Sequence, residues 1–165
     1  MLVNFPTDQQ TLRKSLGMFS TGVAIVTTND SHNKAFGLTI NSFSSLSLDP
    51  PFIIWNISIK STLKDIFQNS KNYVVHILTK HHTNIANIFA KKDILARFNG
   101  IDTKLSPSGT IMIEKNFMAW FDCYNYKQYE EGDHIIMIGR IEHLYYDNNN
   151  SPLIFCKGTF HETNI

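Results

Sequence analysis

The sequence predicts a mainly β protein that forms a single domain over residues 1–165, and three observations support this fold class. Roughly seven or eight runs of β-branched and aromatic residues are separated by turn-forming residues. About three short segments have helical spacing instead. Because strands outnumber crossover helices, an antiparallel barrel, closed or half-closed, is favoured over a βαβ array. A hydrophobic content of 42% in 165 residues is enough for one core.

The first half of the chain is expected to begin with a helix over residues 7–19. Leu12, Leu16 and Phe19 have helical spacing, and Thr7 with Gln10 fits a capping box. Residues 22–28 and 35–43 are expected to form a hairpin around the turn-forming residues 29–34. A strand over residues 51–57 and a helix over residues 61–70 follow directly.

The second half is expected to be richer in strands. Residues 73–78 are typical of a short buried strand, and residues 83–90 of a small helix. The pattern is weak over residues 94–109, where residues 106–109 read as a loop. Long strands are predicted over residues 117–126, 134–145 and 153–161, with turns at 130–133 and 147–152.

Composition argues against several classes of function. With 15 Lys and Arg against 14 Asp and Glu, we expect no binding of nucleic acid or of an anionic membrane. No membrane span or signal peptide is evident, so a cytoplasmic location is expected. Cys123 and Cys156 lie in separate apolar runs and are expected to be reduced, buried thiols. His81 and His82 lack further ligands at metal-binding spacing, so no metal site is predicted.

Small polar side chains concentrate at residues 37–51, which end in a double proline. Strand alternation would place Thr39 and Asn41 on one face and Ile40 and Ser42 on the other. Side chains of this kind offer hydrogen bonds to a ligand without filling its space. A polar strand end with no ligand is the alternative.

A second group of polar residues lies where the strand over residues 51–57 meets the next helix. It comprises Asn56, Ser58, Lys60, Ser61 and Thr62. Backbone N–H groups at a helix N-terminus, hydroxyls and a cation together suit a phosphate group. The simpler interpretation is that Ser61 or Thr62 caps the helix with Asp65 as partner, and the two are compatible.

Two further residues could bind a ligand or take part in a reaction. Arg97 could hold a phosphate bidentately, or it could form a surface ion pair. His134 follows Gly132 and Asp133 at the start of a long strand, where Asp133 could affect its orientation and charge. A structural or solvated histidine is the alternative. The chain has no GxGxxG motif, so a Rossmann mode of nicotinamide binding is set aside.

Three motifs in this order resemble the short-chain flavin reductases, the NAD(P)H:flavin oxidoreductases of the FMN-binding split-barrel class. They are residues 21–28, residues 37–51, and the Gly132-Asp133-His134 motif with Ile138-Gly139-Arg140 after it. The resemblance covers nearly the whole chain. It implies an antiparallel split β-barrel with a few short helices, and an enzyme that moves a hydride from NAD(P)H to FMN or FAD.

The resemblance also implies roles for individual residues. The flavin contacts would be Thr39, Asn41, Ser42 and Phe43, and the ribityl chain and phosphate would be held by Asn56, Ser58, Lys60, Ser61 and Thr62. Phe89, Ala90 and Arg97 would be secondary flavin contacts, with Phe160 on the closing strand, where a tyrosine is common in the family. His134 would lie near the nicotinamide as the catalytic residue. Glu131, in place of a common glycine, favours NADH over NADPH.

Partners are implied in the same way. Family members are typically homodimers with flavin at the subunit interface, and the reduced flavin would pass to a flavin-dependent monooxygenase. One alternative is an oxidase of another small substrate on the same barrel, similar to pyridoxamine-phosphate oxidase. The other is a protein that binds flavin, or another heterocycle, without turnover.

Overall fold

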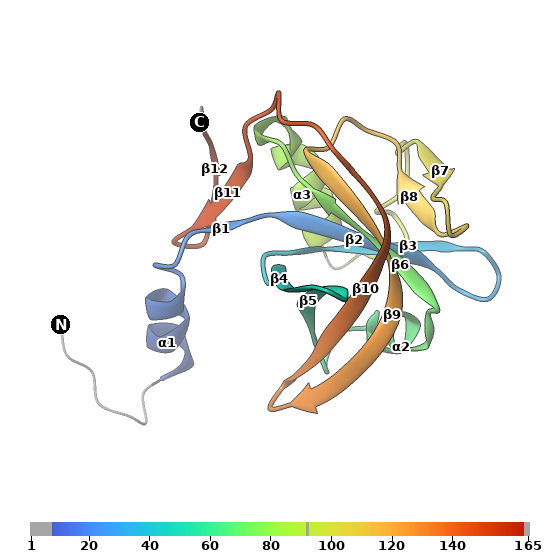
Figure 1. The fold of residues 1–165 in the computed structure, drawn as a ribbon. Helices are drawn as coiled ribbons and strands as arrows, with labels where there is room; N and C mark the ends of the chain where they lie inside the picture. Colours follow the sequence, from blue (N-terminus) through green and yellow to red (C-terminus); the bar gives the residue numbers. More distant parts are fainter. Residues whose placement is uncertain (1–7, 92, 164–165) are drawn as a thin grey trace.

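A seven-stranded antiparallel sheet is the main body of the computed structural model, which describes residues 8–91 and 93–163 (Figure 1). Its strands follow the order β3-β2-β6-β9-β10-β5-β4. Their bounds are β2 Ala24–Asn29, β3 Ala35–Ile40, β4 Ser44–Leu48, β5 Pro51–Ser58, β6 Asn72–Ile77, β9 Ala119–Glu131 and β10 His134–Tyr146. Every pair of neighbours is antiparallel, which confirms the prediction of a mainly β, antiparallel fold.

Two smaller sheets and short helices complete the described part of the chain. One sheet has the order β1-β11-β12, with β1 Thr21–Gly22, β11 Leu153–Cys156 and β12 Thr159–Glu162. The other is the hairpin of β7 Thr103–Leu105 and β8 Ile111–Ile113. The helices are α1 Gln9–Leu16, α2 Lys64–Asn69, α3 Thr83–Ala90 and the 3-10 turn η1 Lys80–His82. Figure 1 shows α1 beside the β1-β11-β12 sheet at one side of the molecule, and α1 has no buried residue.

Side-chain alternation along the strands builds the core. Ile53, Trp55 and Ile57 of β5 point inward, and the residues between them point outward. They pack with Tyr73 and other aromatic residues inside the main sheet, whereas a second cluster forms around α3 and β2. Burial of these apolar side chains supplies the main driving force for the fold.

The main sheet curls so that strands far apart in its order lie near each other. Five steps of pairing separate β3 from β5, yet residues of both strands line one cavity. The edge strands β3 and β4 are not hydrogen-bonded to each other, so the described sheet does not close. The cavity therefore opens where the sheet fails to close.

Two predicted helices are shorter than expected. The first runs over Gln9–Leu16, and its N-cap is Asp8, whose carboxylate accepts a hydrogen bond from the Thr11 amide at 2.9 Å. Thr7, expected as that cap, lies outside the described residues. The second is Lys64–Asn69 and begins after Leu63, with no side-chain cap. Ser61 accepts from the Leu63 amide at 3.2 Å, so it supports the turn before the helix without capping it.

Several strand boundaries also differ from the prediction. The strand expected over 35–43 ends at Ile40, and β4 forms after a short turn. The run over 153–161 is a hairpin, because Lys157 and Gly158 adopt positive φ angles of 51° and 83°. The weakly patterned region ends in the β7–β8 hairpin, whose first strand is wholly exposed and leaves little apolar signal.

Candidate functional site

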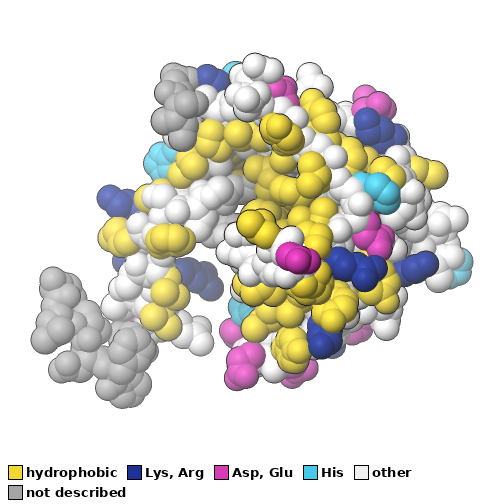
Figure 2. Space-filling model, in the orientation of Figure 1, with side chains coloured by type: hydrophobic (Ala, Val, Ile, Leu, Met, Phe, Trp, Pro, Cys, Tyr) yellow, Lys and Arg dark blue, Asp and Glu magenta, His cyan; other side chains and the backbone are white. Residues whose placement is uncertain are grey.

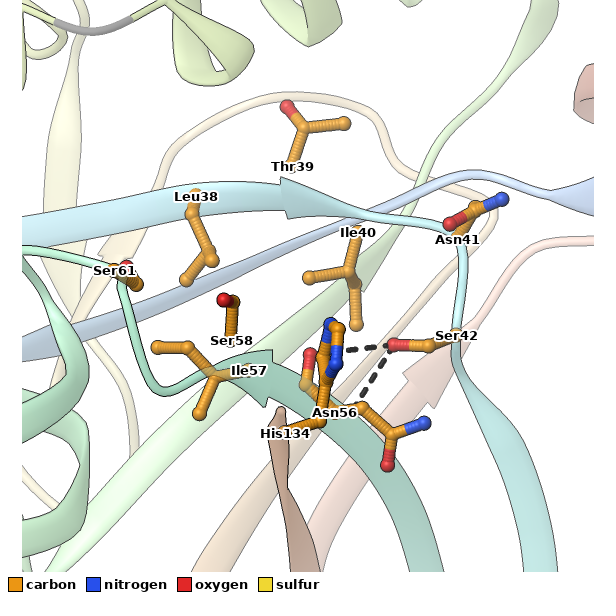
Figure 3. A pocket seen from close by; sticks show the side chains of 10 residues that line it. All are labelled: Leu38, Thr39, Ile40, Asn41, Ser42, Asn56, Ile57, Ser58, Ser61 and His134. Carbon is orange, nitrogen blue, oxygen red and sulfur yellow. Dashed lines mark hydrogen bonds between the residues drawn. The ribbon is translucent and has the colours of Figure 1, made fainter. Parts of the chain in front are cut away.

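A cavity of about 420 Å³ lies between β3 and the paired strands β5 and β10 (Figure 3). The chain reaches it from four places: β3, the turn after it, the end of β5 with its following turn, and the start of β10. Its lining residues are Leu38, Thr39, Ile40, Asn41, Ser42, Asn56, Ile57, Ser58, Ser61 and His134. Seven of these ten were predicted as site residues from the sequence.

The cavity has one apolar and one polar wall. Figure 3 shows Leu38 and Ile40 of β3 pointing into the space from one side, opposite Ser58 and the ring of His134. Antiparallel pairing puts His134 directly opposite Ser58. A wall of this mixed character suits a flat ring with polar edges, since the ring face can pack while its rim makes hydrogen bonds.

Ser42 links the two walls. Its hydroxyl oxygen accepts a hydrogen bond from the Asn56 amide at 3.0 Å, and its hydroxyl lies 3.4 Å from the Asn56 carbonyl oxygen, to which it donates (Figure 3). The side chain therefore holds the turn after β3 against β5. The structure places Ser42 at the cavity, but its own hydrogen bonds are already made to the backbone.

Other polar groups at the cavity remain available to a ligand. The side-chain amides of Asn41 and Asn56 make no hydrogen bond to the described part of the chain. Ser58 accepts from the Lys60 amide at 3.3 Å, which leaves its hydroxyl hydrogen free to donate. Such neutral donors and acceptors match a ligand with carbonyl, imide and hydroxyl groups.

His134 forms a close pair with its neighbour Asp133. The distance between His134 Nδ1 and Asp133 Oδ1 is 2.7 Å. The hydrogen bond and charge of His134 lower the pKa of Asp133, and the charge of Lys60 adds to this effect. Asp133 is therefore ionised at neutral pH. A hydrogen bond from the Ile59 amide to the Asp133 carbonyl, 3.1 Å long, ties this turn to the end of β5.

A second, smaller cavity adjoins the first across the end of β3. Its volume is about 180 Å³, and Thr39, Ile40 and Asn41 line both cavities. The remaining lining residues are Val23, Ala90, Phe155 and Phe160. Thr39 points away from the larger cavity, as Figure 3 shows, and donates to the Ala86 carbonyl of α3 at 2.7 Å. The expected alternation of Thr39 and Ile40 is thus confirmed.

Three other predicted residues lie in the core or beneath β3. Phe43 stacks on Phe121 at 5.7 Å between ring centroids. Phe89 is fully buried and meets the edge of Phe98. Arg97 is buried too, and its guanidinium donates to the Gly37 carbonyl at 2.6 Å and to the carbonyl of Lys91. These contacts are with the protein itself.

Lys60 and Thr62 are exposed in the turn beside the cavity and do not line it. The lining residues that sequence reasoning did not single out are Leu38 and Ile40, which form the apolar wall, and Ile57 of β5. Their signal was present, because each belongs to a predicted strand. What was missing was the curl of the sheet, which turns two separate strands toward one space.

Metal and membrane sites find no support in the described residues. No group of three His, Cys, Asp or Glu side chains is placed to bind a metal ion there. None of the helices in this part of the chain is both long and apolar enough to span a bilayer. Both cysteines are free thiols; Cys123 is buried, as expected, whereas Cys156 is half-buried. Burial raises the pKa of the Cys123 thiol.

Comparison with known proteins agrees with this architecture. The family model described as "Flavin reductase like domain" matches residues 16–164. A flavin reductase from Pseudomonas putida is 33% identical over 159 residues, which cover 96% of this chain and 92% of the relative. The reductase component of a flavin-dependent trigonelline monooxygenase from Acinetobacter baylyi is 35% identical over 81% of this chain, which spans 42% of that protein.

A solved structure is similarly close. The NADH:FAD oxidoreductase SgcE6 of Streptomyces globisporus C-1027, in complex with NAD and FAD fragments, matches with a TM-score of 0.91 and 28% identity. The match covers 99% of this chain and 97% of that one. The similarity therefore extends over the whole fold.

Proposed function

This chain belongs to the flavin reductase-like domain family, and we propose that it transfers a hydride from NADH to FMN or FAD in the cavity between β3, β5 and β10. One observation carries the proposal: the apolar wall of Leu38 and Ile40 faces the polar wall of Ser58 and His134 across a space of about 420 Å³. This arrangement fits the face and the polar edge of a flavin ring.

The bound molecules supply the redox chemistry, because the nicotinamide gives up a hydride that the flavin accepts. The protein's task is to hold the rings and to control the surroundings. The amides of Asn41 and Asn56 and the hydroxyl of Ser58 would donate to the flavin edge or ribityl chain. Ser61 and the nearby Lys60 would lie toward a phosphate. His134 would face the reacting rings and hold a proton.

NADH is the proposed donor. Glu131 and Asp133 put negative charge on the turn that leads into His134. The additional phosphate of NADPH would be repelled there, by an amount that falls with rising salt. The similar Streptomyces protein is named an NADH:FAD oxidoreductase. The choice between FMN and FAD depends on how far a ligand extends beyond the cavity.

The reduced flavin is proposed to serve a separate flavin-dependent monooxygenase. The Acinetobacter relative is the reductase component of such a system. We also propose a cytoplasmic location, since cells make and recycle NADH there.

We further propose that the curled sheet is a split barrel and that the protein is a homodimer. Ile54, Ile136 and Ile138 point outward from β5 and β10 and are only partly buried, and Leu48 of β4 is exposed. Hydrophobic side chains gather in this area of Figure 2. An apolar patch contiguous with a ligand site favours a second copy as its cover. Leu48→Asp should lower the dimer fraction in sedimentation velocity, and a monomeric wild type would contradict the dimer.

The function is tested by the oxidation of NADH without oxygen, with FMN or FAD added in turn and with NADPH as the alternative donor. The proposal expects turnover whose rate rises with the concentration of free flavin, and a preference for NADH. Flavin binding without NADH oxidation would move the protein to the oxidase or carrier alternatives. If the protein neither binds flavin nor oxidises NADH, the cavity is not a flavin site.

A further inference from the structure

Asp133 and His134 form a carboxylate–imidazole pair at the mouth of the larger cavity. His134 lines the cavity, whereas Asp133 does not. Asp133 nevertheless lies within hydrogen-bond distance, 2.7 Å, of His134 Nδ1. We infer that Asp133 is a positioning residue, which fixes the ring of His134 and its protonation at Nδ1 and so leaves Nε2 for the ligand. The inference rests on the proposed function and deepens it.

The backbone around this pair is well anchored, although both side chains are accessible to solvent. Gly132 has a φ of 60°, which the tight turn between β9 and β10 requires. His134 is paired on both sides, with Glu131 of β9 and with Ser58 of β5. The Ile59 amide donates to the Asp133 carbonyl at 3.1 Å. The backbone that carries the two side chains is therefore fixed at both residues.

Hydrogen-bond chemistry decides which nitrogen carries the proton. The carboxylate of Asp133 is ionised at neutral pH, so it can accept a hydrogen bond but cannot donate one. Nδ1 must then be the donor, and in the neutral ring Nε2 is left as an acceptor. His134 Nε2 makes no hydrogen bond to the described residues. When the ring gains a proton at Nε2, the Asp133 carboxylate stabilises the resulting charge.

Two other charged residues, Glu131 and Lys60, lie near the ring of His134. Glu131 lies opposite on β9, and Lys60 follows β5 on the other side. Lys60 is close enough to act on Asp133 and lies next to the turn that holds the pair. Asp133 has the shortest contact of the three, so its removal should have the largest effect on the ring.

A proton on Nε2 matches the balance of the proposed reaction. NADH loses a hydride and becomes NAD⁺, and the flavin takes up that hydride, with its electron pair, together with one proton. His134 can hold this proton at Nε2 beside the cavity and be recharged from solvent, because its side chain is 48% exposed. Without Asp133, the ring could rotate and exchange its two neutral tautomers, which would misplace that proton.

The test measures the ring directly in the ligand-free protein. Nitrogen NMR of the histidine side chains reports the tautomer of each ring, and the spectrum of His134→Gln identifies the signal of His134. Asp133→Ala removes the acceptor and its charge, whereas Asp133→Asn keeps an acceptor oxygen. Glu130→Ala is the matched control, since it removes an exposed carboxylate from the same hairpin two residues before the turn.

We expect the wild-type ring to carry its neutral proton on Nδ1. Asp133→Ala should populate the other tautomer, because the acceptor that holds the proton on Nδ1 is gone. Asp133→Asn should retain part of the Nδ1 preference. In turnover with NADH and FMN, Asp133→Ala should lower kcat by about tenfold, below the usual range for a lost proton donor because the site is open to water. Glu130→Ala should leave tautomer and kcat unchanged.

Two results would overturn the inference, and they are distinguishable. If Asp133→Ala leaves the tautomer of His134 as in Glu130→Ala, Asp133 does not position the ring, whatever the wild-type turnover. If the wild-type protein shows the fixed tautomer but oxidises no NADH with either flavin, the proposed function fails, and the role in flavin reduction fails with it. A shifted tautomer together with a lowered kcat in Asp133→Ala supports the inference.

Discussion

Gly139 of β10 is the position where a single added carbon should be most disruptive. A Cβ at this site would lie 2.3 Å from the hydroxyl oxygen of Tyr73, 2.9 Å from Tyr73 Cζ and 3.0 Å from the Cβ of Cys123. Contacts under 3.0 Å are essentially never seen, so one group must move by about 1 Å. Tyr73 is fully buried and meets the edge of Trp55 at 5.5 Å, so it has little room to move.

The expected cost of Gly139→Ala follows from this crowding. Overpacking of a close-packed core costs about 1–3 kcal/mol, and here three contacts at or below 3.0 Å involve two neighbouring side chains. We therefore expect a loss near the top of that range, about 3 kcal/mol, in the free energy of unfolding measured by urea denaturation. Gly22→Ala is the matched control, because a Cβ there meets nothing within 4 Å.

A second substitution tests the cause of that loss. The Tyr73 hydroxyl makes no hydrogen bond to the described residues, so its removal leaves no partner unpaired. Tyr73→Phe should therefore recover about 1–2 kcal/mol in the Gly139→Ala background and change the wild type by less. If Gly139→Ala is no more destabilised than Gly22→Ala, or if Tyr73→Phe relieves nothing, the predicted crowding between β10 and β6 is wrong.

Three further predictions concern buried polar groups and the cavity. His76 is fully buried, and burial lowers its pKa to about 4; because the unfolded chain binds the proton near pH 6.5, stability should fall between these two values as the pH is lowered. The free energy of unfolding should fall by about 2 kcal/mol by pH 5. Urea denaturation at several pH values should show this fall in the wild type and a smaller one in His76→Asn. Arg97→Met should cost about 2–3 kcal/mol, since charge-assisted bonds to the carbonyl of Gly37 and to a second carbonyl are lost. The ratio of FMN affinity to riboflavin affinity should be the same in Arg97→Met as in the wild type. A selective loss of FMN affinity in this variant would show that Arg97 contacts the phosphate. Asn56→Leu should weaken flavin binding about tenfold in a fluorescence titration, whereas exposed Asn87→Leu on α3 should not; equal affinities would exclude Asn56 as a contact.

The antiparallel sheet and much of the site could be predicted from local sequence. Strand alternation sets Trp55 inward and Asn56 at the cavity, and both follow from the period of two in β5. The Gly132-Asp133-His134 motif predicts a turn and a histidine at a strand start, as found. These features depend on residues close together in the chain.

Other features depend on long-range packing and could not be predicted in the same way. The Arg97 guanidinium donates a hydrogen bond to the carbonyl of Gly37, sixty residues away. Nothing in the local sequence around Arg97 indicates this contact. The hairpin at Lys157 depends on positive φ angles, which leave little trace in an apolar run. The apolar wall of the cavity exists because the sheet curls, which brings Leu38 opposite Ser58.

The most direct test of the account is a single-turnover reduction of flavin, carried out without oxygen, by NADH carrying deuterium at the transferable C4 position. With wild-type protein, the account predicts bleaching of the flavin absorbance, slowed by the deuterium, and much weaker at the same flavin concentration in Asn56→Leu than in Asn87→Leu. Bleaching that is unaffected by the substitution at the cavity would place the reaction elsewhere. The absence of bleaching with bound flavin would contradict the central claim that this cavity reduces flavin.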